Sequence, residues 1–112
     1  MMRAFSNASY ADRRRDPRIA VNRQAKVLDG PFPLNAFIRD ISAGGAKLAF
    51  PDRMPGADAL ILIDLASALA YDCRVAWRKG GECGVRFLKT QDLRGLVPGQ
   101  FDAARRIWHA SR

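Results

Sequence analysis

Two short polar signatures carry the side chains of this 112-residue sequence that could do chemistry. The first is Arg14-Arg15-Asp16-Pro17-Arg18, in a basic N-terminal segment, and the second is Asp40-Ile41-Ser42-Ala43-Gly44-Gly45. The guanidinium groups of the first signature can donate paired hydrogen bonds to a phosphate or to the edge of a base. The second signature offers a carboxylate, a hydroxyl and a turn opened by glycine. Together they predict a site for a ligand that is both a base and a phosphate.

Guanine matches these groups edge by edge. Its Hoogsteen edge presents O6 and N7 as paired acceptors, which suit the fork of Arg14 or Arg18. Its other edge presents N1–H and N2–H donors, which suit the carboxylate of Asp40, while Ser42 suits a phosphate. Gly45 has no Cβ and would let a ligand approach the backbone. Each signature alone has an ordinary explanation, because terminal arginines are usually solvated and D-x-S-x-x-G usually bonds local backbone.

The order and spacing of the two signatures, R-x-x-x-R followed by D-x-S-x-x-G, resemble the PilZ domain, a β-barrel receptor family for cyclic di-GMP. The resemblance covers about residues 13–88, and Val75-Ala76-Trp77 and Gly84-Val85-Arg86-Phe87 look like late strands of that family. It implies a six-stranded barrel with a C-terminal helix and an N-terminal arm that folds over the ligand. The ligand contacts that it implies are Arg14, Arg18, Asp40, Ser42 and Gly45, with Arg15, Gly44, Trp77 and Arg78 as further lining.

Arg13 bears on how many ligands bind. In the family, the residue before the first motif arginine tends to separate receptors of one ligand from receptors of an intercalated pair. Two stacked cyclic di-GMP molecules bring four phosphate charges together, and a guanidinium can stack on guanine while it offsets that repulsion. We therefore expect two ligands per chain, with Arg13 helping to hold the second. The alternative is that Arg13 is one more solvated charge of the tail.

Composition limits the class of protein and of partner. The length fits one domain, and 48% hydrophobic residues predict a packed globule. A net charge of +8 predicts an anionic partner: a nucleotide, a nucleic acid or an acidic protein. The longest apolar stretch, residues 57–70, is interrupted by Asp58 and Asp64, so we expect no membrane span and a cytoplasmic location. We expect no metal site, because Cys73 and Cys83 are isolated, and no enzyme, because no catalytic constellation is visible.

Alternating apolar residues predict an all-β fold, a six-stranded antiparallel barrel, with residues 1–12 as a flexible tail and residues 13–112 as the domain. Ile38 and Ile41 are three apart, which predicts a bulge near Arg39 and Asp40. Residues 60–65 fit a doubly buried strand or a short buried helix. From about Gly99 the spacing of apolar residues predicts a short amphipathic helix, packed over an open end of the barrel. A hairpin turning near Gly80-Gly81 sets Cys73 opposite Phe87, too far from Cys83 for a disulfide.

The resemblance implies a stand-alone cyclic di-GMP receptor. Its arm would become ordered on binding and change the surface shown to an unidentified downstream protein. Two other functions stay open. The first is a basic barrel that binds single-stranded nucleic acid. Such barrels stack bases on exposed aromatic rings, whereas Phe50, Trp77 and Phe87 fall on core positions of their strands, so no nucleic acid is expected. The second is a PilZ-like module that binds only protein, against which the intact signatures argue.

Overall fold

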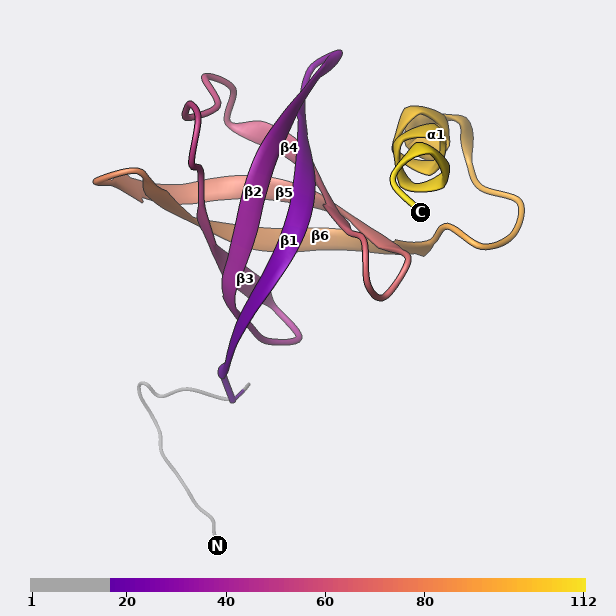
Figure 1. Ribbon diagram of the computed structural model, residues 1–112. Coiled ribbons are helices and arrows are strands. Elements are labelled where there is room, and N and C mark those ends of the chain that lie inside the picture. Colours follow the sequence, from indigo (N-terminus) through magenta and orange to yellow (C-terminus); the bar gives the residue numbers. More distant parts are fainter. Residues whose placement is uncertain (1–16) are drawn as a thin grey trace, which may run out of the picture.

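The computed structural model describes residues 17–112 of the chain, in which six antiparallel strands close into a barrel (Figure 1). In chain order the strands are β1 (Ile19–Asp29), β2 (Phe32–Ile41), β3 (Gly45–Ala49), β4 (Ala59–Asp64), β5 (Leu69–Lys79) and β6 (Glu82–Asp92). Around the barrel they follow the order β1-β2-β3-β6-β5-β4. The predicted six-stranded barrel is therefore confirmed. The expected arm and tail, with Arg13, Arg14 and Arg15, lie outside the described residues.

The apolar run at residues 60–65 forms most of β4, which is buried on both sides. Leu60 and Leu62 belong to the core inside the barrel. Ile61 and Ile63 belong to a second apolar cluster, together with residues of the C-terminal helix. Alternate side chains of one strand therefore fill two different cores, and this explains why the run is apolar on both faces apart from Asp64.

The chain ends in a 3-10 turn, η2 (Gly99–Phe101), and the helix α1 (Asp102–Ala110). This segment begins at Gly99, as predicted, but the helix does not lie where it was predicted to lie on the barrel. Phe101, Ala104 and Trp108 pack with Leu28 and Ile63 in the second cluster. The helix therefore lies beside the barrel, against the outward side chains of β1 and β4, instead of over an open end (Figure 1). The reason is that these outward positions are themselves apolar and need cover.

The predicted bulge in β2 is confirmed. Ile38 pairs with Leu48 of β3, but Asp40 pairs with Lys47, so β2 has one more residue than β3 at this point. Ile38 is fully buried and Ile41 packs against the same core. The extra residue lets both isoleucines face inward while Asp40 faces out.

Trp77 corrects one sequence prediction. It was expected in the core, with Phe50 and Phe87, but its side chain is 44% exposed. The pairing of β5 with β6 shifts between Val75 and Trp77, so Trp77 faces Gly84 on the outer surface. A second bulge, which the alternation of apolar residues did not reveal, turns the indole outward. Phe50 is buried and Phe87 packs against the core, as predicted.

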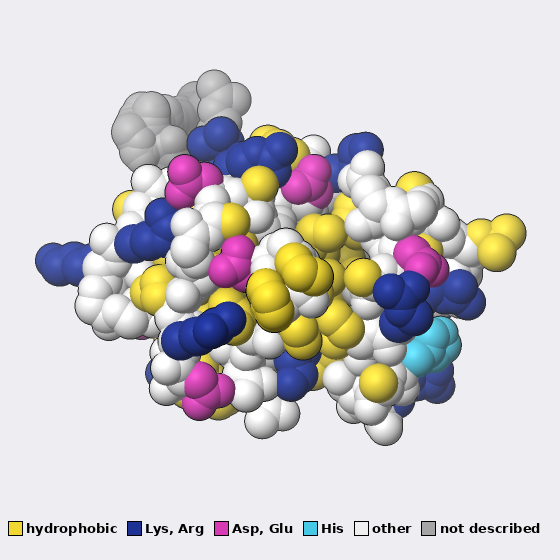
Figure 2. All heavy atoms as spheres, turned by 90° about the horizontal axis from the view of Figure 1, so that it is seen from above, with side chains coloured by type: hydrophobic (Ala, Val, Ile, Leu, Met, Phe, Trp, Pro, Cys, Tyr) yellow, Lys and Arg dark blue, Asp and Glu magenta, His cyan; other side chains and the backbone are white. Residues whose placement is uncertain are grey.

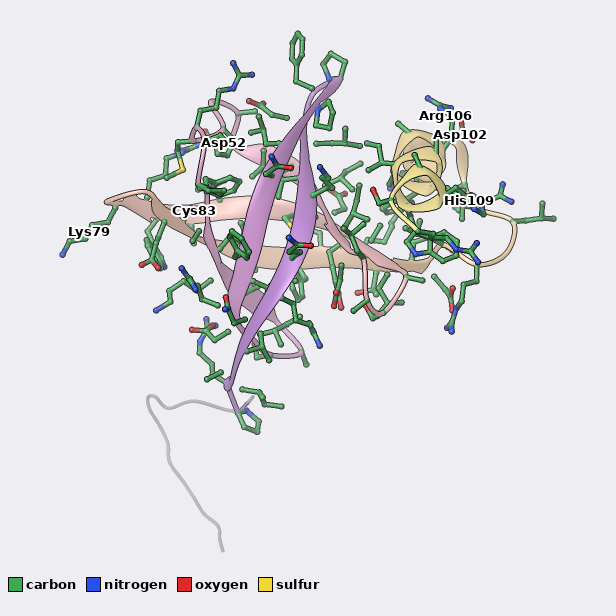
Figure 3. All side chains as sticks on the ribbon, in the orientation of Figure 1. Asp52, Lys79, Cys83, Asp102, Arg106 and His109 are labelled. Atoms are coloured by element: carbon green, nitrogen blue, oxygen red, sulfur yellow. The ribbon has the colours of Figure 1, made fainter. Side chains whose placement is uncertain are left out.

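The β5–β6 hairpin turns at Gly80 and Gly81, both with positive φ, and projects from the barrel with Lys79 near its tip (Figure 3). Cys73 pairs with Phe87, as predicted, and both cysteines are free and buried. Burial raises the pKa of the Cys73 thiol to about 12 and that of Cys83 to about 11. Both thiols are therefore protonated at neutral pH and closed to solvent.

We expect neither thiol to react with a chromogenic disulfide reagent at neutral pH while the protein is folded, because thiolate is the reactive form. Both should react at once in denaturant. Absorbance of the released chromophore measures the two rates. A fast phase that consumes one thiol per folded chain would contradict the buried position of Cys73 or Cys83.

Candidate functional site

The start of β1 and the β2–β3 connection meet at one end of the barrel (Figure 1). Ala20 pairs with Asp40, and Arg18, just before β1, therefore lies alongside the same carboxylate. Arg18 Nη1 is 2.5 Å from Asp40 Oδ1, with the two side chains 40% and 20% exposed. An ion pair this accessible stabilises a fold by only about 0–1 kcal/mol. Both groups can therefore exchange this contact for another partner at little cost.

Lys47 is a residue of this site that the sequence analysis missed. It pairs with Asp40 across β2 and β3, and its Nζ is 4.0 Å from Asp40 Oδ2. Asp40 thus stands between two cations, one from each neighbouring strand. In the sequence Lys47 is an ordinary outward residue of β3, and only the bulged register of β2 sets it opposite Asp40.

The connection from Ser42 to Gly45 is held by its own hydrogen bonds. The Ser42 N–H donates to the Gly45 carbonyl at 2.8 Å, and the Gly44 N–H donates to Ser42 Oγ at 3.2 Å. The Phe87 N–H donates to the Gly44 carbonyl at 2.9 Å, so β6 is also tied to this turn. This is the local backbone role that a D-x-S-x-x-G segment ordinarily has. A ligand contact from Ser42 or Gly44 stays a prediction.

Gly45 is the first residue of β3, and the reason for glycine there is a close approach of strands. A Cβ at this position would collide with the carbonyl oxygen of Val85 in β6. The pairing of Gly45 with Arg86 holds the two backbones together at this point. Room for a ligand at Gly45 therefore stays a prediction, because the contact with β6 already requires the missing side chain.

A row of paired residues crosses the outer surface from Asp40 to Trp77. Asp40 pairs with Lys47, Lys47 pairs with Gly84, and Gly84 pairs with Trp77. The indole Nε1 of Trp77 occupies the space that a Cβ of Gly84 would fill. The indole therefore lies on the backbone of β6, on the same barrel surface as the two charged residues. This arrangement combines a carboxylate, an ammonium group and an aromatic face.

The structure does not bring Arg78 to this group. Its Nη1 donates to Asp58 Oδ1 at 3.0 Å and its Nη2 donates to the Ala57 carbonyl at 2.6 Å. These bonds tie β5 to the segment before β4. Arg18, Asp40, Ser42, Gly45 and Trp77 are thus gathered on the surface formed by β2, β3, β6 and the strand ends beside them, whereas Arg13, Arg14 and Arg15 lie outside the described residues.

The sequence model of the PilZ domain matches residues 12–97, which include both signatures and the whole barrel. The chain belongs to the PilZ family. PilZ domains are generally receptors for cyclic di-GMP, and they are regulatory binding domains instead of catalysts.

Similarity to individual proteins is more distant. The PilZ domain of CeSA from a cellulose-synthesising bacterium, known from a crystal structure, is 17% identical, with 86% of this chain and 99% of that chain covered and a TM-score of 0.49. No curated protein matches the sequence. Within residues 17–112 of this PilZ domain, no helix is long and apolar enough to cross a membrane.

We expect Gly45→Ala to lower the free energy of unfolding by about 1–3 kcal/mol, because overpacking against a strand backbone forces the strands apart. Gly56→Ala is the matched control, since a Cβ there would meet no atom within 4 Å. Urea denaturation of both variants measures the difference. Equal stability of the two variants would refute the close approach of β3 and β6.

Proposed function

We propose that this PilZ domain is a receptor for cyclic di-GMP, which binds on the outer barrel surface beside the start of β1. The observation that carries the proposal is the ion pair between Arg18 and Asp40. These residues come from the two signatures, 22 positions apart in the sequence, and their side chains are in contact. A guanidinium and a carboxylate, both reachable from solvent, are the two groups that the two edges of guanine require.

The ion pair also suggests how the ligand would enter. Asp40 would leave Arg18 and accept hydrogen bonds from N1–H and N2–H of guanine. Arg18 would then donate to a phosphate or to O6 and N7. Lys47, whose Nζ is near Asp40 in the free protein, would then donate to a phosphate of the ligand. Trp77, further along the same row, offers a ring on which a base can stack.

The rest of the proposal concerns the segment before Arg18. Arg14 is expected to contact the ligand with Arg18, and Arg15 to line the site. Ordering of this basic segment on the ligand would change the surface that the domain shows to a downstream protein. Net charge supports an anionic ligand in general, because the chain carries +8.

One observation favours the nucleic-acid alternative. Trp77 is exposed, although the alternation of its strand predicts a core position. Single-strand platforms, however, use a series of exposed aromatic rings interleaved with basic strands. Phe50 is buried and Phe87 only partly exposed. Phe32 is 59% exposed, but it lies at the start of β2, at the other end of that strand from Asp40. Trp77 is therefore the exposed ring in the row of residues that begins at Asp40. A short RNA is therefore an informative competitor of cyclic di-GMP.

Calorimetric titration should show binding of cyclic di-GMP and much weaker binding of GMP, cyclic di-AMP and a short RNA. Adenine has no N1–H donor and has an amino group in place of O6, so it leaves Asp40 unpaired. Asp40→Ala and Arg18→Ala should each lose about tenfold or more in affinity, since one good bidentate contact is worth about 1–3 kcal/mol. Equal affinity of the wild type for the two cyclic dinucleotides would refute the role of Asp40.

The matched control for these substitutions is Asp102→Ala. Asp102 is an exposed carboxylate paired with an arginine, Arg106, as Asp40 is with Arg18, but it lies on α1 beside the barrel (Figure 3). The substitution Asp102→Ala removes one negative charge without changing any residue of the candidate site. The variant should therefore bind cyclic di-GMP as the wild type does. RNA binding tighter than that of cyclic di-GMP would favour the nucleic-acid function instead.

We expect two cyclic di-GMP molecules per chain and one for Arg13→Leu. The physical reason is that leucine cannot offset the phosphate repulsion within a stacked ligand pair. Calorimetry at protein concentrations well above Kd gives the ratio directly. One ligand per wild-type chain, or two on the leucine variant, would contradict the role of Arg13.

A further inference from the structure

An ion pair with a buried carboxylate lies at the end of the barrel where β1 begins and β4 ends. Asp64 is 1% exposed, and its Oδ2 is 2.9 Å from Nη2 of Arg23, whose side chain is 37% exposed. Tyr71 stacks on Phe87, with 4.1 Å between ring centroids. Burial, followed by the charge of Asp64, raises the pKa of Tyr71. Phe87 in turn is bonded to Gly44 in the second signature.

This pair adds little to the stability of the core. Among the described residues, Asp64 Oδ1 and Arg23 Nε are buried without a hydrogen-bond partner. Burial of the Asp64 carboxylate is costly, and a pair with unsatisfied atoms and a partly exposed arginine recovers only part of that cost. Hydrophobic residues of similar volume often stabilise such a position equally well. Stabilisation of the barrel is therefore not a sufficient reason for this ion pair. The position of Arg23 in β1 suggests a different role for it.

The position of Arg23 is informative because β1 is paired unevenly. Backbone pairing of β1 with β4 covers only residues 25–28. Within residues 19–24, Ile19, Ala20, Arg23 and Gln24 pair with β2, and the described strands give this stretch no backbone partner on the other side. The register with β2 is also offset between Ala20 and Arg23. The contact of Arg23 with Asp64 is thus a side-chain link from this singly paired stretch to β4.

We propose that Arg23 and Asp64 are positioning residues for ligand binding: their ion pair anchors the start of β1 and thereby holds Arg18 opposite Asp40. Arg18 directly precedes residues 19–24, so the register of that stretch decides where its guanidinium lies. Because this stretch pairs with β2 alone, fewer backbone contacts hold it in place than hold residues 25–28. The buried carboxylate supplies the second attachment from inside the barrel. The proposal rests on the proposed function, because ligand affinity is one of its two measurements.

The test compares wild type with Arg23→Met/Asp64→Leu, which removes both charges together and leaves neither one unpaired. We expect the melting temperature to stay near that of the wild type or to rise. Affinity for cyclic di-GMP should fall roughly tenfold, since a small misplacement of a binding group is costly. In the ligand-free protein, backbone amides of residues 19–22 should exchange hydrogen faster, while those of residues 25–28 stay unchanged.

A second comparison separates positioning from general support of the barrel. In an Arg18→Ala background the same double substitution should cause little further loss of affinity, because the group that it positions is gone. Losses that add in full would overturn the proposal. Unchanged exchange at residues 19–22 would also overturn it, and this measurement needs no ligand. If the wild type does not bind cyclic di-GMP, the proposed function is wrong. Amide hydrogen exchange at residues 19–22 would still show whether Arg23 and Asp64 anchor the start of β1.

A second variant guards against misfolding. Arg23→Gln/Asp64→Asn is neutral and keeps polar groups that can still bond each other, so it is suited to the same space. It should show faster exchange at residues 19–22, because the neutral pair attracts less strongly than the ion pair. Exchange equal to that of the wild type in this variant would count against the anchor as well.

Discussion

The extra residue that β2 carries at Arg39 and Asp40 is the constraint on which the candidate site depends. A regular strand from the buried Ile38 would direct Asp40 into the apolar core, where a carboxylate is costly. The bulge turns it out beside Arg18 and Lys47 and still returns Ile41 to the core. Arg39, whose Nη1 donates to Asn22 Oδ1 at 2.8 Å, ties the bulged part of β2 to β1. The polar site and the apolar core are thus compatible only through this irregularity.

Two glycines let the strands next to the bulge come close enough to form one surface. Gly45 gives β3 its approach to the Val85 carbonyl, and Gly84 gives the indole of Trp77 its place on β6. Side chains at either position would displace the backbone or the indole. The row from Asp40 to Trp77 therefore depends on the absence of a Cβ at Gly45 and Gly84.

The helix and the candidate site occupy different walls of the barrel. The helix α1 covers outward residues of β1 and β4, whereas the row of site residues crosses β2, β3, β6 and the outer end of β5. Seen from above, toward the end of the barrel where the β1–β2 hairpin turns, hydrophobic side chains gather in the middle and charged side chains lie around them (Figure 2). The apolar requirement of β4 is thus met without loss of the polar surface at the start of β1.

Local sequence determined the strands, the β2 bulge, the glycine turns and the start of the C-terminal segment, because alternation and turn chemistry are properties of neighbouring residues. It also gave the two signatures from which the contact of Arg18 with Asp40 was expected to follow. Tertiary structure alone decided that Lys47 faces Asp40, that Trp77 is exposed, that α1 covers a wall of the barrel, and that Arg23 reaches Asp64. The positions of Lys47 and Trp77 depend on the register of neighbouring strands, where a single bulge changes which side of the sheet a residue faces. The positions of α1 and Arg23 depend on contacts between segments far apart in the chain.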